Sequence, residues 1–315
     1  MANPLEQSFT HILPNPSIPS RTIGSVVRWL SLKIRATFIT YHHFNIEESF
    51  MQTLFSKYHG TGNDFIMVDN RANNLLRHHP ELYALLCNRR FGIGADGVIL
   101  LQNSPGYDFE MVYYNSDGYE GSMCGNGGRC AVAFAKQVGI IEGNHTRFLA
   151  IDGVHEAHIE DTGIVSLLMQ PVMEIKEKDG NYILNTGSPH FVRLITAFEE
   201  VDVFGEGAAI RFSPPFREEG INVNFVQLLN GFAKVATYER GVEDETYSCG
   251  TGVVASGIAL AVRHKQLGNV NTEVHTKGGV LWVKFHNHDH RHFTDIWLQG
   301  PATFVFSGQI ALDIP

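Results

Sequence analysis

The chain has 315 residues, of which 43% are hydrophobic and 18% charged, and its formal net charge is -9. This composition is typical of a globular protein long enough for two domains with buried cores, and no run of about 18 apolar residues predicts a transmembrane helix. Because an acidic chain is poorly steered toward nucleic acid or anionic membranes, we expect a small-molecule substrate and neither of those partners. The 4 cysteines lie outside any CxxC pair, which favours free thiols in the cytoplasm.

The first 50 residues differ from the rest of the sequence. Residues 26–35 (VVRWLSLKIR) are basic and amphipathic, but they lack the apolar core and the small-residue cleavage site of a secretory signal. A targeting peptide stays open as an alternative. We favour the simpler interpretation that residues 1–50 form a disordered extension or precede a true start at Met51.

An internal duplication organises the remaining sequence. The pattern C-G-x-G occurs at 124–127 and again at 249–252, 125 positions later. A Thr-Gly pair recurs at the same spacing, at 61–62 and at 186–187. One such motif would be weak, but two motifs in register predict two copies of one domain.

Each copy is predicted to contain short strands followed by one buried helix. A strand is expected at 109–114, and the later stretch 131–135 is apolar on every face, as in a buried helix. The second copy repeats this order, with strands at 223–228 and 280–285 and an apolar helix at 253–261. We therefore predict an α+β fold of two pseudo-symmetric domains, each a curved, mostly antiparallel sheet wrapped around a central buried helix.

Cys124 and Cys249 stand directly before the two glycine-rich starts of these helices. The first N–H groups of a helix have no partner inside it and the dipole is positive there, so such an end binds a carboxylate readily. The same position favours thiolate over thiol, and we expect it to lower the pKa of both cysteines toward neutrality. Cys87 and Cys130 lie in or beside apolar stretches and are interpreted as ordinary buried side chains.

Two pseudo-symmetric halves are expected to bring the two helix ends face to face across a cleft. A carboxylate bound between them would have one sulfur on each face of its α-carbon. One thiolate can then remove the α-proton while the opposite thiol returns a proton, which inverts the centre. A closed, dry site would strengthen every dipole directed at the developing charge.

Several motifs of the chain resemble those of the diaminopimelate epimerase family, over about 265 of the 315 residues. They follow the family's order and are KYHGTGNDF at 57–65, RFGIGADG at 90–97, NSDG at 115–118, CGNG at 124–127, GSPH at 187–190, GINVNF at 220–225, YERG at 238–241 and CGTG at 249–252. Two positions depart from the commonest pattern. Ser188 stands where asparagine is usual, and Gly97 stands where glutamine is frequent.

The resemblance implies an isomerase that interconverts LL- and meso-2,6-diaminopimelate in lysine biosynthesis, with no cofactor and no metal. It implies that Cys124 and Cys249 are the two bases. Backbone N–H groups would bind the reacting carboxylate, and polar side chains would hold the amines and the distal carboxylate. The first group is Gly125, Asn126, Gly250 and Thr251, and the second is Asn63, Asn115, Ser188, Asn222, Glu239 and Arg240, with Ser188 the doubtful member.

The domain boundaries follow from the duplication and from the resemblance together. We expect the first half at 51–170 and the second at 171–301, with a linker near 171–179, where charged residues interrupt the strands. The resemblance implies that residues 302–315 return to the first half. We also carry a homodimer as an expectation.

Glu239 and Arg240 suit a substrate with a second charged end. Arg240 can bind a distal carboxylate through two parallel hydrogen bonds, and Glu239 can accept from an ammonium group. The hydroxyl of Ser188 can still donate and accept, with a shorter reach than asparagine. His190 is interpreted as a residue that orients a thiol or a substrate group, with a purely structural role as the alternative.

Two other classes of function stay open at this point. A proline or histidine racemase would keep both cysteines and lack the distal charged pair. The other alternative is a non-enzymatic small-molecule binder or thiol redox sensor, since two sulfurs close enough to serve one carbon could be joined by oxidation. The histidine-rich segment 286–292 is interpreted as an exposed hairpin loop and not as a metal site, because no matching ligand motif occurs elsewhere.

Overall fold

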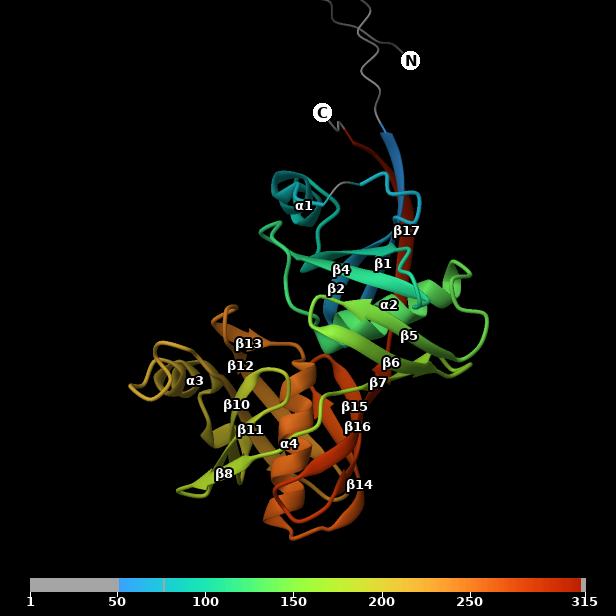
Figure 1. The fold of residues 1–315 in the computed structure, drawn as a ribbon. Coiled ribbons are helices and arrows are strands. Elements are labelled where there is room, and N and C mark those ends of the chain that lie inside the picture. Colours follow the sequence, from blue (N-terminus) through green and yellow to red (C-terminus); the bar gives the residue numbers. More distant parts are fainter. Residues whose placement is uncertain (1–50, 76, 313–315) are drawn as a thin grey trace, which may run out of the picture. The chain divides into compact units, whose positions relative to one another are not determined.

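The computed structural model describes residues 51–75 and 77–312, so the expectations for residues 1–50 lie outside the described residues. The first half of the described chain contains seven strands and two helices (Figure 1). In chain order they are β1 (Met51–Gly60), β2 (Asn63–Asp69), α1 (Pro80–Cys87), β3 (Gly97–Gln102), β4 (Phe109–Asn115), α2 (Gly125–Gln137), β5 (His145–Ala150), β6 (Gly153–Ile159) and β7 (Ile164–Leu168).

The second half repeats this order of elements with three additions, β8, η1 and β13. It consists of β8 (Ile175–Lys178), β9 (Asn181–Asn185), β10 (Pro189–Ile195), η1 (Phe198–Glu200), α3 (Val203–Arg211), β11 (Asn222–Leu228), β12 (Ala233–Glu239), β13 (Asp244–Thr246), α4 (Gly250–Arg263), β14 (Gly268–Thr276), β15 (Gly279–Asn287) and β16 (Phe293–Pro301). A last strand, β17 (Thr303–Leu312), follows.

The strand pairings show the duplication directly. β2 pairs in parallel with β3, and β10 pairs in parallel with β11, each across an intervening helix. β3–β4 and β11–β12 are antiparallel, and the parallel pairings β4–β5 and β12–β14 each span a buried helix, α2 or α4. Most other pairings are antiparallel. The predicted α+β fold of two pseudo-symmetric halves is therefore confirmed.

Two strand pairings tie distant parts of the chain together. β7 of the first half pairs antiparallel with β16 of the second, with Leu168 opposite Trp297. β17 lies antiparallel to β1, with Leu312 opposite Met51. The turns of the two halves also touch, because a β-carbon placed on Gly278 would overlap the carbonyl oxygen of Thr61.

The segment 171–179, where we expected the domain linker, contains the strand β8. β8 pairs antiparallel with β9, and Ile175 packs against the hydrophobic core around α4. The charged residues that suggested a linker, Lys176, Glu177 and Lys178, are exposed along this strand. Consecutive strand residues point to opposite faces, so these charges lie on both faces of β8, while its backbone pairs with β9 along one edge.

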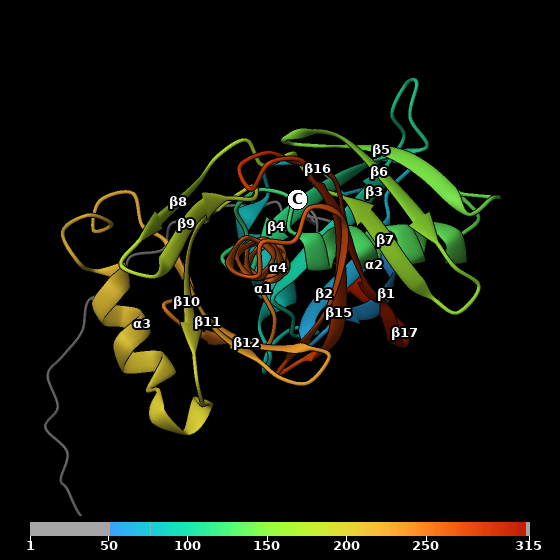
Figure 2. The same cartoon turned by 90° about the horizontal axis from the view of Figure 1, so that it is seen from below.

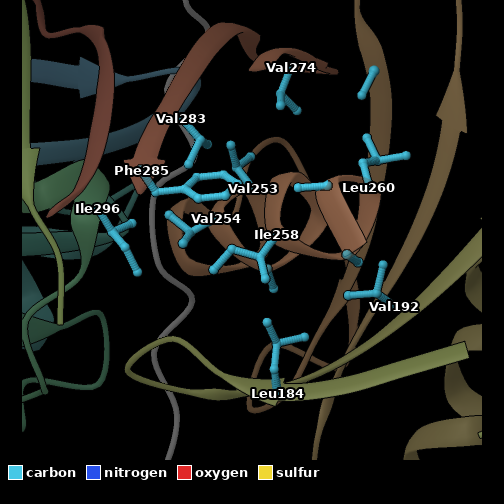
Figure 3. Close-up of a cluster of buried hydrophobic side chains, with 14 of the residues drawn as sticks. Leu184, Val192, Val253, Val254, Ile258, Leu260, Val274, Val283, Phe285 and Ile296 are labelled. Carbon is cyan, nitrogen blue, oxygen red and sulfur yellow. The ribbon is translucent and has the colours of Figure 1, made fainter. Parts of the chain in front are cut away.

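Each half closes around its own helix. The core around α4 contains Val253, Val254 and Ile258 of the helix together with side chains from β15 such as Val283 and Phe285 (Figure 3). A second core surrounds α2 in the same way. A helix that is apolar on every face must be enclosed by sheet, and each fully buried Val, Ile or Phe contributes about 1.5–3 kcal/mol.

The histidine-rich segment forms the loop between β15 and β16, as predicted. His288 Nε2 lies 2.9 Å from Thr294 Oγ1, and His292 Nδ1 lies 2.7 Å from Asp289 Oδ2. These local contacts hold the hairpin loop in its conformation.

None of the helices in residues 51–75 and 77–312 is long and apolar enough to span a membrane.

Candidate active site

Cys124 and Cys249 are the N-cap residues of α2 and α4. Both have extended backbones, with φ of -111° and -112°, so each cysteine ends an extended segment just as the helix begins. The Sγ atom of Cys124 accepts a hydrogen bond from the backbone N–H of Gly127 at 3.3 Å. Each sulfur therefore lies beside the unpaired N–H groups at the positive end of a helix.

The starts of the two helices meet. A β-carbon placed on Gly250 would lie 3.5 Å from the α-carbon of Gly125, and a β-carbon on either glycine would lie 2.9 Å from Leu298 Cδ2. In Figure 2, α4 is seen along its axis and α2 from the side, so the helices converge at their ends and do not pack along their length. The close approach of these two glycines brings two sets of helix N–H groups to one place.

Asn126 connects the two cysteine-bearing loops. Its Nδ2 donates to the carbonyl oxygen of Ser248 at 2.9 Å, and Ser248 directly precedes Cys249. The same Nδ2 lies 3.4 Å from Asn63 Oδ1, and Cys124 Sγ lies 3.7 Å from that oxygen. The structure thus joins Asn63, Asn126 and Cys124 into one hydrogen-bonded group that reaches Ser248, the residue before Cys249.

His190 reaches Cys249 through Thr251. The ring is fully buried, its Nε2 lies 2.9 Å from Thr251 Oγ1, and that oxygen lies 3.5 Å from Cys249 Sγ. Burial, with the nearby charge of Arg240, lowers the pKa of His190 to about 3, so the ring is neutral. Nδ1 accepts from Asn224 Nδ2 at 3.0 Å, which places the ring proton on Nε2, facing Thr251.

Ser188, Asn222 and Arg240 form a second polar group. Asn222 Nδ2 donates to Ser188 Oγ at 2.9 Å, Arg240 Nη2 donates to the same oxygen at 3.4 Å, and Asn222 Oδ1 accepts from the Arg240 backbone N–H at 2.9 Å. Glu239 accepts from Thr246 Oγ1 at 2.9 Å. Burial raises the pKa of Glu239, against the effect of the Thr246 hydrogen bond.

Gly97 and Asn115 border a tyrosine that the sequence analysis did not identify. A β-carbon on Gly97 would overlap the ring of Tyr113, which packs edge-on against Phe65 with ring centroids 5.9 Å apart. The amide of Asn115 lies against Gly121, on the loop that leads to Cys124. Burial raises the pKa of Tyr113, and the nearby charges of Cys124, Asp96 and Glu239 add to this effect. Tyr113 therefore occupies the space that a side chain at position 97 would need.

The expected lowering of the cysteine pKa values is wrong for this structure. Burial raises the pKa of Cys124, and the N–H groups of Gly127 and Asn126 only partly oppose it. Burial also raises the pKa of Cys249, and the negative charge of Glu239 raises it further. Removal of the sulfurs from water outweighs the helix dipoles, because a thiolate loses more solvation than the thiol.

One group in the described ranges places three possible metal ligands close together. The ligand atoms of His145, Glu156 and His158 lie within 4.8 Å of one another on β5 and β6. A cavity of about 690 Å³ is found between β1, β2 and β17, and it is bordered by Phe134 and Val138, at the opposite end of α2 from Cys124. Neither feature includes the residues assembled around the cysteines.

Comparisons of the sequence with known proteins give consistent matches. The sequence model of the family "Diaminopimelate epimerase" matches residues 55–173 and 182–305. A diaminopimelate epimerase of Flavobacterium psychrophilum is 51% identical over 255 residues, which cover 81% of this chain and 98% of that protein. One from Aquifex aeolicus is 38% identical over 282 residues, covering 82% of this chain and 98% of the other.

Two solved structures share the fold at low sequence identity. A phenazine biosynthesis protein of the PhzF family from Bacillus anthracis superposes with a TM-score of 0.66 at 14% identity, covering 83% of this chain and 100% of that one. A hydroxyproline epimerase from Agrobacterium vitis, with bound trans-4-hydroxy-L-proline, gives 0.59 at 16% identity, covering 84% and 94%. These two likenesses show the fold alone, and the sequence matches show that the chain belongs to the diaminopimelate epimerase family.

Proposed function

We propose that this chain epimerises LL-2,6-diaminopimelate to meso-2,6-diaminopimelate, a step of lysine biosynthesis. The observation that carries the proposal is the meeting of two helix starts, each capped by a cysteine, at Gly125 and Gly250. A carboxylate bound at this junction receives N–H donors from both helices. Its α-carbon then lies between the two sulfurs.

The reaction is a transfer of two protons across one carbon. One cysteine, as the thiolate, takes the α-proton and becomes a thiol, while the electron pair left on carbon is delocalised into the carboxylate. The opposite thiol gives its proton to the other face of the carbon and becomes a thiolate. No group is oxidised or reduced, and the two cysteines end with their protonation states exchanged, so this scheme needs neither pyridoxal phosphate nor a metal.

The remaining predicted residues are assigned to binding. Gly125, Asn126, Gly250 and Thr251 would hold the reacting carboxylate, and His190 would orient Thr251 beside Cys249. The distal end of the substrate would be held by Asn63, Asn115, Ser188, Asn222, Glu239 and Arg240. The contacts of Ser188 with Asn222 and Arg240 support its inclusion, although the family usually has asparagine there.

The wider setting of the enzyme is proposed from more general observations. We assign the halves to residues 51–170 with 302–315, and to residues 171–301, and we place the enzyme in the cytoplasm with no nucleic-acid or membrane partner. Exposed apolar side chains on β1 and β17, Leu54, Phe304, Val305 and Phe306, support a homodimer. Light scattering on the purified protein would contradict the dimer if it returned the mass of one chain.

The experiment that tests the function is incubation with LL-diaminopimelate in deuterated water. We expect the meso isomer to accumulate with one deuterium at the inverted α-carbon, because the proton that is returned comes from a thiol that exchanges with solvent. Proton NMR and chiral chromatography measure the two products. Inversion of proline or histidine, together with none of diaminopimelate, would instead assign the chain to another substrate.

A further inference from the structure

Arg129 is the largest fully buried side chain of the described residues, and the mechanism above does not use it. It lies on the second turn of α2, in the run GNGGRCAVAFA, and its exposed fraction is 0%. Arginine is almost never fully buried unless it is paired with an acid. Arg129 lies about one helical turn from Cys124, so a negative charge formed at this cysteine lies near a buried cation.

The guanidinium group of Arg129 is bound by neutral oxygens. It donates to the Gly125 carbonyl oxygen at 3.2 Å, to Asn126 Oδ1 at 3.0 Å and to Thr61 Oγ1 at 3.4 Å. Among residues 51–75 and 77–312, none of the ion pairs includes Arg129, and its buried Nε has no hydrogen-bond partner. An uncompensated buried cation costs several kcal/mol, and a negative charge formed nearby removes part of that cost.

The contacts of Arg129 extend to both cysteines through one amide. Because Asn126 Oδ1 accepts from Arg129, the Nδ2 group of Asn126 must face the other way, toward Ser248 and Asn63. Ser248 directly precedes Cys249, and Asn63 Oδ1 lies 3.7 Å from Cys124 Sγ. A single guanidinium therefore fixes the orientation of the amide that links the two cysteine loops.

The positive charge of Arg129 acts on the thiol of Cys124. The ionisable groups that interact with Cys124 are those of Glu239, Cys249, Tyr113, Cys130 and Arg129. Arg129 is the cation of this set, and its charge opposes the effect of burial and of Glu239 on the pKa of Cys124. Cys130 is kept as a neutral thiol, since burial raises its pKa strongly.

From this geometry we propose that Arg129 is a positioning residue, resting on the epimerase function above. It holds the amide of Asn126 that joins the two cysteine loops, and it supplies the buried positive charge that stabilises the anion shared between the thiolates and the substrate carbon. It acts through α2 and Asn126 and does not touch the reacting atoms.

The test compares Arg129→Met with Arg129→Lys, and uses Cys130→Ala as a matched control. Cys130 is the next residue of the same buried helix and lies outside the proposed machinery. Three quantities are measured for each protein: the melting temperature, kcat and KM for diaminopimelate, and the pH midpoint of alkylation of Cys124 by iodoacetamide, followed by peptide mass spectrometry. The alkylation midpoint reports on the thiol in the absence of substrate.

We expect Arg129→Met to lower kcat by about 10²–10³-fold, the size of loss typical of one preorganised electrostatic contact, with a much smaller change in KM. The alkylation midpoint of Cys124 should rise by at least about one pH unit. Arg129→Lys should recover at least tenfold of the kcat and most of the midpoint shift, because the charge is retained. Cys130→Ala should resemble the wild type in kcat and midpoint.

Other outcomes overturn the proposal. A wild-type kcat and midpoint in Arg129→Met would show that the arginine is not needed for the chemistry. A lower melting temperature with an unmoved midpoint would reduce its role to packing. If Arg129→Met does not fold, Arg129→Lys decides alone, and a midpoint displaced by a full unit despite the retained charge would reject the electrostatic role. If the wild-type enzyme does not act on diaminopimelate, the proposed function fails, while the alkylation arm still tests Arg129.

Discussion

Replacing either Cys124 or Cys249 with alanine should lower kcat for the epimerisation of diaminopimelate by about 10²–10⁴-fold, the usual contribution of a positioned acid or base. The two losses should be similar, because inversion needs a proton taken on one face and a proton given on the other. Each of the two cysteines is the N-cap residue of its own helix, so the loss of one sulfur leaves one face of the α-carbon without a thiol. Steady-state kinetics in both directions measures the effect.

The two remaining cysteines provide the matched controls. Cys87 and Cys130 are both buried, and Cys87→Ala and Cys130→Ala should keep kcat close to the wild-type value. Circular dichroism and the melting temperature establish that each variant is folded. Normal turnover by a folded Cys124→Ala or Cys249→Ala enzyme would exclude the two-base mechanism.

Replacing Arg240 with methionine should lower kcat/KM for diaminopimelate by about 30- to 1000-fold, which corresponds to the loss of about 2–4 kcal/mol for a truncated hydrogen-bonded charge pair. Arg240 donates to Ser188 Oγ and to the Glu219 carbonyl oxygen, so its guanidinium is held in place beside Asn222. We assign to it the distal carboxylate of the substrate. The loss should therefore depend on that carboxylate being present.

Lysine is the probe that isolates this contact, because it is diaminopimelate without one carboxylate. Any slow exchange of the lysine α-proton in deuterated water should be nearly the same in the wild type and in Arg240→Met. Arg193→Met is the control, since Arg193 is paired with Glu206 on α3 and takes no part in the proposed site. If Arg240→Met lost as much α-proton exchange with lysine as it lost kcat/KM with diaminopimelate, Arg240 would support the fold of the site and would not bind the distal carboxylate.

The positions of the two cysteines illustrate what could be predicted. Their shared C-G-x-G context identified two equivalent helix starts, because glycine at these positions and an apolar helix behind them are local properties of the chain. We expected the two helix starts to meet because of the pseudo-symmetry. In the structure Gly125 and Gly250, which are 125 positions apart in the sequence, lie close together. The sign of the cysteine pKa shift was predicted wrongly, because burial depends on the packing of both halves and not on the helix start alone.

Other residues of the site had no local signal. Tyr113 belongs to a strand, and only the absent side chain of Gly97 on the neighbouring strand gives it space beside Cys124. Arg129 is a charged residue near the start of a helix, and the local sequence does not show that it is buried without an acidic partner. The strand β8 carries consecutive charged residues, which are exposed on both of its faces, and only its backbone pairing with β9 reveals it as a strand.

The sequence by itself determined the duplication, the two buried helices, the two cysteines at their starts and the family of the chain. These features depend on the order and spacing of residues, which the chain carries before it folds. The tertiary structure decided which groups surround each sulfur, how far each is removed from water and which polar side chains share a hydrogen bond. Those properties depend on contacts between the halves, because solvation and electrostatic interactions are set by neighbours in space and not by neighbours in sequence.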